Sequence, residues 1–376
     1  MTDSTRILVA DDQADVLEAL RWLLSSEGYD AQFVNTTHAV VERLQADRFD
    51  LLLMDLNYSR DTTSGREGLD LIPRVRKLDS GLPIVVMTGW GSIDMAVEAM
   101  RLGARSFVQK PWDDVTLLEI VKREIGDARA ARRRDRQVER EFEEARLIQR
   151  GLLPRAIPAI AGIDIAVSWQ PADGVGGDCF DTMVFGRALG VSVADIAGKG
   201  LPAALLMSNL QAAVRAFALD AAQPAAIYTS VNRLLCRNMA AGRFATFCYA
   251  RIDIEARRVV YANAGHNPPV LIRGNGSSET FTTGGMVLGV FPESTYSQTE
   301  VIVGAGDRLI FYTDGITEAR RPGEDDEYGV ERLTALALGR RRDSAEALKT
   351  AILDDVNRFT NGHFEDDATL IVVALT

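Results

Sequence analysis

The sequence predicts two domains of different fold class: an α/β domain with a five-stranded parallel sheet and, after a long helix, a four-layer α+β domain. Short apolar runs alternate with amphipathic stretches through the first third of the chain, which is the pattern of strands joined by helical crossovers. No glycine or proline occurs between Gly126 and Gly151. After Pro154 strand-like runs follow one another around two helical stretches. The length of 376 residues also favours two domains.

The composition is that of a soluble globular protein. Hydrophobic residues make up 47% of the chain and charged residues 25%. The net charge of −11 repels polyanions, so we expect no nucleic-acid partner. The chain contains no apolar run of the roughly 20 residues that a membrane-spanning helix needs. The first residues, MTDSTRILVADD, do not resemble a targeting peptide, and we expect a cytoplasmic protein without a membrane partner.

The cysteines and histidines are too few and too scattered for a metal centre of the zinc type. The chain has three of each, and neither set has the spacing of a zinc site. The cysteines fit buried thiols in a reducing compartment. A metal ion bound by this chain would therefore be held by carboxylates.

Five apolar runs in the first third predict the parallel strands, at residues 7–10, 31–34, 51–54, 84–87 and 106–108. Helical patterns such as residues 16–27 and 93–102 lie between them. In a sheet of this kind, functional sites form beyond the carboxyl ends of the strands. Polar residues follow four of the five runs: Asp11, Asp12, Asp55, Thr88 and Lys110.

Each of these polar residues has an ordinary structural explanation by itself, such as a helix cap or a solvated loop charge. Their shared place at strand ends favours a site. Three carboxylates brought together repel one another, and a divalent cation such as Mg²⁺ makes the arrangement tolerable. A carboxylate nucleophile beside that cation, with a lysine and a hydroxyl for the product oxygens, is suited to forming an aspartyl phosphate.

The first domain resembles the response-regulator receiver family, whose fold is flavodoxin-like. The match rests on Asp11, Asp12, Asp55, Thr88, Phe107 and the pair Lys110-Pro111. The resemblance implies a cognate sensor histidine kinase as partner. It also implies that Asp55 accepts the phosphoryl group. The loop after Asp55, NYSRDTTSGREG, is longer than the common family form and lacks its proline.

The same resemblance implies a role for each remaining residue of the motif. Asp12 and Asp55 would bind Mg²⁺ directly, with Asp11 acting through water and the backbone carbonyl of Asn57 completing the set. Thr88 and Phe107 would form the switch pair that reports phosphorylation. Lys110 would hold the phosphate, and the peptide bond before Pro111 is expected to be cis.

Residues 126–153 predict a helical linker between a domain at 1–125 and a domain at 154–376. The segment is rich in Arg, Glu and Ala, which are acceptable or good helix formers. Eight positions spaced three and four apart, six of them apolar, form a heptad seam that favours a coiled-coil homodimer: Ala128, Ala131, Asp135, Val138, Phe142, Ala145, Gln149 and Leu152. The alternative is a solvated connector whose apolar residues are covered by the two domains.

The second domain is predicted to contain two antiparallel sheets that face each other, with helices outside, as a four-layer α-β-β-α sandwich. Helical patterns cover residues 203–219 and 224–239. The expected strands are residues 163–170, 188–194, 247–254, 259–263, 270–273, 308–312 and 370–375.

Four aspartates border strands of this domain: Asp178, Asp195, Asp314 and Asp366. Asp and Gly are ordinary turn residues, so one such aspartate would mean little. Four of them at the strand ends of one domain favour a shared site. A carboxylate set without histidine suits two Mg²⁺ or Mn²⁺ ions, which can activate a water for phosphate-ester hydrolysis.

At these residues the domain resembles the protein phosphatase 2C superfamily, in its bacterial branch of stage-II sporulation and sigma-factor-regulating phosphatases. The resemblance rests on an ordered series of motifs: ARLIQRGLLP at 145–154, GVGGDCFD at 174–181, VADIAGKGLPAALLMS at 193–208, YANAGHNPPVLI at 261–272, GGMVLGV at 284–290, LIFYTDGITEAR at 309–320, YGVERL at 328–333 and DDATLIVV at 366–373.

The resemblance implies that Asp195 bridges both metals near the Ile196 carbonyl, that Asp178 binds one ion directly or through water, and that Asp314 and Asp366 hold the other. Asp367 is expected beside the ligands in a supporting position, although the two adjacent carboxylates are easily exchanged in such an assignment. His266 is expected to shape its loop rather than to act as a proton donor.

The implied function is a response regulator whose output is the metal-dependent dephosphorylation of a phosphoserine or phosphothreonine protein. The implied substrate is an anti-anti-sigma factor of the STAS type. The alternative is a phosphatase-like domain without activity that acts as a phosphorylation-controlled scaffold for a sigma-factor regulator. A transcription factor is disfavoured by the acidity and by the lack of a helix-turn-helix or basic region.

Overall fold

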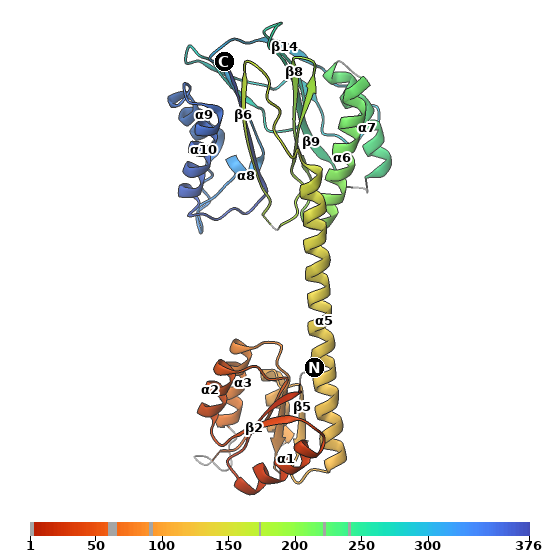
Figure 1. Cartoon of the computed structure of the whole chain (residues 1–376), viewed down its shortest axis with the longest axis vertical. Helices are drawn as coiled ribbons and strands as arrows, with labels where there is room; N and C mark the ends of the chain where they lie inside the picture. Colours follow the sequence, from red (N-terminus) through yellow and green to blue (C-terminus); the bar gives the residue numbers. More distant parts are fainter. Residues whose placement is uncertain (1–3, 59–65, 90–92, 173, 221–222, 240–241) are drawn as a thin grey trace. The chain divides into compact units, whose positions relative to one another are not determined.

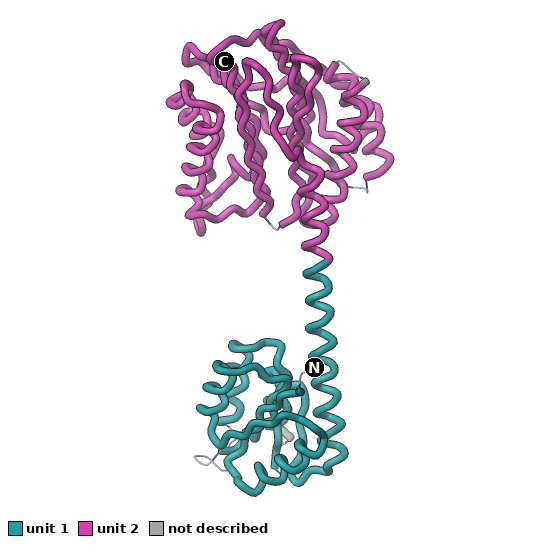
Figure 2. Tube along the Cα trace, in the orientation of Figure 1, with its two compact units in different colours: residues 1–140 teal, residues 141–376 magenta. Residues whose placement is uncertain are grey.

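The computed structural model describes residues 4–58, 66–89, 93–172, 174–220, 223–239 and 242–376. The chain divides into two compact units, residues 1–140 and 141–376, which are coloured separately in Figure 2. The boundary falls within the 39-residue helix α5 (Asp114–Leu152). In the described part of the chain, no helix combines the length and the apolar character needed to span a membrane.

The N-terminal unit is built on a parallel five-stranded sheet. Its strand order is β2-β1-β3-β4-β5, and every neighbouring pair is parallel. The strands are β1 (Arg6–Ala10), β2 (Asp30–Val34), β3 (Leu51–Asp55), β4 (Ile84–Thr88) and β5 (Ser106–Gln109). The helices between them are α1 (Ala14–Ser26), α2 (Thr37–Ala46), α3 (Arg66–Leu78) and α4 (Ile93–Leu102).

Both faces of this sheet are covered, so its central strands β3 and β4 are buried throughout and almost entirely apolar. Leu52 and Met54 pack on one face in a core with α2 and α3, while Leu51 and Leu53 pack on the other with α1 and α5. All five residues of β3 are buried. Such burial explains why the sequence signal was a run of apolar residues rather than an alternation.

The predicted linker is part of α5, and its seam positions differ in burial. Ala128 and Gln149 are buried, the first in the N-terminal unit and the second in the C-terminal unit, whereas Val138 between them is 60% exposed. Two arginines attach the helix to the N-terminal unit: Arg129 pairs with Asp50 at 3.2 Å, and Arg132 pairs with Asp79 at 3.0 Å. Dimerisation through the seam stays a prediction.

The C-terminal unit contains two sheets. One has the order β13-β10-β9-β8-β7, with β14 also paired to β10, and its pairs are antiparallel except β10 with β13. The other has the antiparallel order β12-β11-β15-β16-β6. The strands of the first sheet are β7 (Cys179–Phe185), β8 (Ala188–Ile196), β9 (Ala245–Asp253), β10 (Arg258–Ala264), β13 (Gly284–Gly285) and β14 (Thr299–Ile302).

The second sheet consists of β6 (Ile163–Gln170), β11 (Val270–Ile272), β12 (Ser278–Thr280), β15 (Arg308–Tyr312) and β16 (Ala368–Leu375). Helices α6 (Gly200–Asp220) and α7 (Pro224–Asn238) lie outside the first sheet, and α9 (Gly329–Gly339) and α10 (Ala345–Phe359) lie outside the second, as Figure 1 shows. A short helix, α8 (Asp314–Thr317), follows β15. The predicted four-layer arrangement is confirmed.

Two cores hold these layers together. Val191 and Val193 of β8 pack in one cluster with Leu309 and Phe311 of β15, so the two sheets face each other across an apolar interior. Alternate residues of β15, such as Ile310, point to the other face and join a second cluster with α9 and α10. The period-two pattern of β15 thus places both of its faces in apolar surroundings.

The sequence analysis did not predict β7, α9 or α10. Strand β7 reads CFDTMVF, and its buried Asp181 interrupts the apolar pattern. Two nitrogens of Arg215 on α6 contact this carboxylate, at 2.5 and 3.0 Å, which removes the cost of burying an unpaired charge. A partner 34 residues away along the chain cannot be recognised from the strand itself.

Leu309→Ala is expected to destabilise the C-terminal unit by about 2–5 kcal/mol, because Leu309 is fully buried between the sheets and the change leaves a cavity. Leu219→Ala is the matched control: the same atoms are lost at a position that is 78% exposed on α6. Urea unfolding followed by fluorescence measures both changes. Equal losses for the two variants would contradict the assigned core.

Candidate functional site

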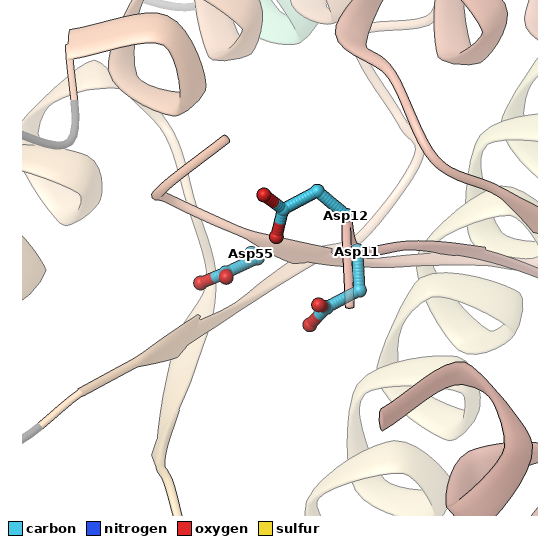
Figure 3. A group of neighbouring side chains, drawn as sticks. All are labelled: Asp11, Asp12 and Asp55. Atoms are coloured by element: carbon cyan, nitrogen blue, oxygen red, sulfur yellow. The ribbon is translucent and has the colours of Figure 1, made fainter. Parts of the chain in front are cut away.

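Three carboxylates meet at the carboxyl ends of β1 and β3 in the N-terminal unit. Asp11 and Asp12 follow β1, and Asp55 ends β3. One carboxylate oxygen from each of the three residues lies within 4.8 Å of the other two (Figure 3). Asp11 and Asp55 are buried and Asp12 is partly exposed. The parallel strands therefore bring together the three aspartates predicted to form a metal site, as the fold rule requires.

Lys110 lies against two of these aspartates. Its Nζ donates to Asp11 Oδ2 at 2.6 Å and to Asp55 Oδ2 at 2.8 Å. Burial raises the pKa of Asp11 in spite of this contact. Burial lowers the pKa of Lys110, but its hydrogen bonds to the two carboxylates outweigh that effect and the net change is upward. One ammonium faces three carboxylates, so the group favours a further cation.

Asn57 and Lys110, two other predicted residues, line the same site. A cavity of about 140 Å³ is lined by Asp12, Asp55, Asn57 and Lys110, among others. Thr88 ends β4 and is buried, whereas Phe107 on β5 is 46% exposed. The Lys110–Pro111 peptide bond is cis, which confirms that expectation. Residues 59–65 of the long loop after Asp55 lie outside the described residues.

The four aspartates predicted for the C-terminal unit lie at ends of strands from both sheets. Asp178 directly precedes β7 and Asp195 lies near the end of β8, both in the first sheet. Asp314 begins α8 after β15, and Asp366 lies two residues before β16, so these two come from the second sheet. Each pair belongs to neighbouring strands.

Asp178 joins the two sheets by hydrogen bonds. Its Oδ2 accepts from the hydroxyls of Thr313 and Thr369, each at 2.7 Å. Thr313 follows β15 and Thr369 belongs to β16. The Asp178 side chain is 1% exposed, and burial followed by the charge of Asp195 raises its pKa well above the usual value. The carboxylate is therefore held firmly with one oxygen already engaged.

The remaining carboxylates influence one another strongly. Burial, followed by the charges of Asp314, Asp366 and Asp367, raises the pKa of Asp195 to about 7. Burial and then Asp366 raise the pKa of Asp314. Segments near residues 178, 195, 314 and 366 thus converge on one place where negative charge is poorly compensated.

Adjacent Asp366 and Asp367 have different surroundings. Asp366 is partly exposed and pairs with Lys199 at 2.9 Å. Asp367 is buried, and its oxygens accept backbone N–H groups of Ala172 at 2.9 Å and Gly177 at 2.8 Å. Asp367 therefore holds Ala172 and the loop at 174–178 in place, while the Asp366 carboxylate is available to the carboxylate group.

Glycines allow these loops to approach one another. A Cβ on Gly176 would lie 1.8 Å from Asp367 Oδ2, and one on Gly315 would lie 2.0 Å from the Asp367 carbonyl oxygen. Neither distance is possible for a real side chain. Gly315 is thus required by the close approach of the Asp367 backbone, and Gly176 leaves room for the Asp367 side chain.

The donor set fits hard divalent cations in both units. Carboxylate and carbonyl oxygens are the ligands preferred by Mg²⁺ and Mn²⁺, and an excess of negative charge in each group suits a cation. Among the described residues, however, only the group in the N-terminal unit has three ligand atoms that all lie within 4.8 Å of one another. The carboxylates of the C-terminal unit are more widely spaced.

Comparisons with known proteins agree with this architecture. Residues 7–122 match the family described as response regulator receiver domain, and residues 186–376 match the family described as Stage II sporulation protein E (SpoIIE). The second match covers more than half of the chain. The chain belongs to the SpoIIE family. Its N-terminal unit contains a receiver domain.

Individual relatives resemble one part or the other. "Phosphoserine phosphatase RsbU" of Bacillus subtilis is 29% identical over 243 residues, which cover 63% of this chain and 70% of RsbU. "Transcriptional regulatory protein FixJ" of Bradyrhizobium diazoefficiens is 33% identical over 131 residues, 35% of this chain and 62% of FixJ. The solved SiaA-PP2C domain of Pseudomonas aeruginosa has a TM-score of 0.58 at 20% identity, covering 64% of this chain and 98% of that one, and supports the fold alone.

His266 of the SpoIIE-family domain is buried, and both nitrogens of its ring form hydrogen bonds. Its Nε2 lies 3.1 Å from the Tyr312 carbonyl, which can only accept, so Nε2 carries the proton and Nδ1 accepts from the Thr246 hydroxyl at 2.8 Å. The backbone of His266 exchanges two hydrogen bonds with the Asn263 side chain. These contacts support the expected loop-shaping role.

Sequence analysis did not identify Thr313, Thr369 or Gln149 as part of the site. The threonines stand next to predicted residues in the motifs YTDG and DDAT, so proximity in sequence was the available signal. Gln149 was assigned to the linker seam. It instead donates from Nε2 to the Gly176 carbonyl at 2.6 Å and accepts from Gly176 N at 3.2 Å. The available signal for Gln149 was its polar side chain at a position of a mostly apolar seam.

The stability of the SpoIIE-family domain is expected to depend on His266 in mildly acidic solution. Burial lowers the pKa of His266 from 6.5 to about 4. Between pH 4 and pH 6.5 the His266 imidazole is therefore protonated more often in the unfolded chain than in the folded chain. The contribution of His266 to stability is therefore complete above pH 6.5, and about 3 kcal/mol of it is lost as the pH is lowered toward 4.

The measurement is urea unfolding of the protein and of His266→Gln at several pH values from 4 to 7. The variant is expected to lose this part of the pH dependence whatever its stability at pH 7. An unchanged slope in the variant would show that other groups cause the acid sensitivity.

Proposed function

We propose that the chain is a response regulator whose output is a Mg²⁺- or Mn²⁺-dependent protein serine/threonine phosphatase. The observation that carries the proposal is the convergence of four chain segments on one group of carboxylates that raise one another's pKa. The proposed organisation is a receiver at 1–125, a linker at 126–153 and a phosphatase domain at 154–376. Similarity to a phosphoserine phosphatase supports the choice of reaction.

In the phosphatase domain, two divalent cations would be held by Asp195, the Ile196 carbonyl, Asp178, Asp314 and Asp366. Bound there, they would supply an activated water and neutralise charge on the phosphoryl group. Thr313 and Thr369 orient Asp178 through their hydroxyls. Asp367 keeps the loop that carries Asp178 in place through backbone N–H groups.

In the receiver, Asp55 is the proposed phosphoacceptor. Asp12, Asp55 and the Asn57 carbonyl would bind Mg²⁺ directly, and Asp11 would act through water. Lys110 already contacts Asp55 and would hold the phosphate after transfer. Thr88 and Phe107 are proposed as the switch pair. A cognate sensor histidine kinase would supply the phosphoryl group.

The proposed substrate is a phosphorylated STAS-type anti-anti-sigma protein in a partner-switching pathway. The support is the likeness to RsbU over 243 residues. A protein substrate also agrees with an open carboxylate group in which Asp366 is partly exposed. We further propose a cytoplasmic homodimer joined through the seam on α5.

Helix α5 is the proposed route of control, because its last turns contact the carboxylate loops. Gln149 makes two hydrogen bonds to Gly176, two residues before Asp178, and is 2% exposed. Gln211 of α6 donates to the Leu152 carbonyl at 2.9 Å. A change in α5 would reach both the loop at 174–178 and the helix that follows Lys199.

The purified chain with Mn²⁺ is expected to release phosphate from a phosphorylated STAS protein, and Asp195→Ala is expected to reduce the rate by about 100-fold or more, because it removes the central metal ligand. Leu219→Ala, at an exposed position, serves as the control. Phosphate release is measured with and without chelator. Stable binding of the STAS protein without any release would support the scaffold alternative and defeat the enzymatic proposal.

Gln149→Leu is expected to abolish the difference between the phosphatase rates of the unmodified protein and of the protein treated with beryllofluoride, a phosphoryl analogue. The change leaves the buried Gly176 N–H and carbonyl without these partners, at a cost of about 1–3 kcal/mol each. Gln137→Leu, an exposed position on the same helix, is the matched control. If the variant retains the full difference between the two rates, control does not pass through this contact.

A further inference from the structure

The carboxylate group of the phosphatase domain poses an electrostatic problem for its proposed substrate. A phosphate monoester carries nearly two negative charges, and it would approach a site formed by Asp178, Asp195, Asp314 and Asp366. Two divalent cations would only balance those four carboxylates. A cationic side chain beside the group that is not paired with a carboxylate would therefore strengthen the binding of the phosphoryl group.

Three cations near these segments already serve carboxylates. Lys199 pairs with Asp366 at 2.9 Å and also donates to the Glu365 carbonyl. Arg215 makes two contacts with buried Asp181, and Arg320 pairs with Glu327. Lys199 thus already balances one charge of the group, and the two arginines are paired with carboxylates outside it.

Arg243 has different surroundings. Its Nη1 donates to the Ala197 carbonyl at 2.7 Å, and Ala197 is the residue after Ile196. The main chain is tied at the same place, because Ala197 N donates to the Phe244 carbonyl at 2.9 Å and Asp195 pairs with Thr246 in the sheet. Among the described residues, no carboxylate pairs with the half-buried Arg243.

Glycine provides the space that this side chain occupies. A Cβ on Gly198 would lie 1.6 Å from Arg243 Nη1, so any other residue there would displace the guanidinium. Gly198 also has φ +116°, which side chains rarely adopt. The loop AGKG at 197–200 is thus shaped around Arg243, directly after the proposed ligands Asp195 and Ile196.

We infer that Arg243 binds the phosphoryl group of the substrate at the metal site. A guanidinium has five N–H donors, and the bond to Ala197 uses one of them. The others suit two phosphate oxygens at once. The inference rests on the proposed function, and it assigns a phosphate-binding residue to that site.

The test compares Arg243→Met and Arg243→Lys with Arg237→Met, a control that removes an exposed arginine from α7. Inorganic phosphate is the probe, used both as a product inhibitor and as a ligand in calorimetry of the Mn²⁺-loaded protein. Arg243→Met is expected to weaken phosphate binding about 10- to 100-fold, the range of a charge-assisted hydrogen bond, with a smaller loss for Arg243→Lys. The Mn²⁺ affinity of Arg243→Met should stay near the wild-type value. The phosphate affinity of the control Arg237→Met should also be close to that of the wild type.

Two substrates separate phosphoryl binding from other roles. If Arg243 contacts the phosphoryl group, Arg243→Met raises KM for p-nitrophenyl phosphate and for the phosphorylated STAS protein by similar factors. A loss restricted to the protein substrate, or a parallel loss of Mn²⁺ affinity, would overturn the assignment. A wild-type protein that binds phosphate but hydrolyses neither substrate would instead contradict the proposed function, and calorimetry would still decide the role of Arg243.

Discussion

Repulsion between crowded carboxylates is the constraint on which both units depend. Each unit directs several aspartates to one end of its sheets, where burial and neighbouring charges raise the pKa of Asp11, Asp178, Asp195 and Asp314. Such an arrangement opposes folding, since charged groups prefer water and distance from like charges. The chain tolerates it because the rest of each unit is well packed, with fully buried strands such as β3 and β16.

The two units compensate for this repulsion in different ways. In the receiver, Lys110 contacts two of three carboxylates directly, so part of the charge is balanced within the protein. In the SpoIIE-family domain the hydroxyls of Thr313 and Thr369 stabilise Asp178, and within the described part of the chain only Lys199 pairs with a member of the group. The second group therefore keeps more uncompensated negative charge.

The sequence predicted the elements whose signals are local. The strands at 163–170 and 308–312 were given with their observed limits, because apolar periodicity marks them. The aspartates were found because they lie at or near the ends of strands. Contacts between distant segments were not predictable: Arg215 with Asp181, Gln149 with Gly176, and Arg243 with Ala197 each need the folded chain. These contacts depend on packing geometry, which periodicity does not encode.

The adjacent residues Asp366 and Asp367 have different roles: Asp366 belongs to the carboxylate group, and Asp367 stabilises the fold around it. Asp367 accepts backbone hydrogen bonds from Ala172 and Gly177 and lies against Gly176 and Gly315, whereas Asp366 pairs with Lys199. Loss of the Asp366 carboxylate would leave that scaffold intact, while loss of the Asp367 carboxylate would release it. A single substitution of Asp366 could therefore remove a carboxylate of the group and leave the domain folded. A substitution of Asp367 would instead disturb the fold of the loop that carries Asp178.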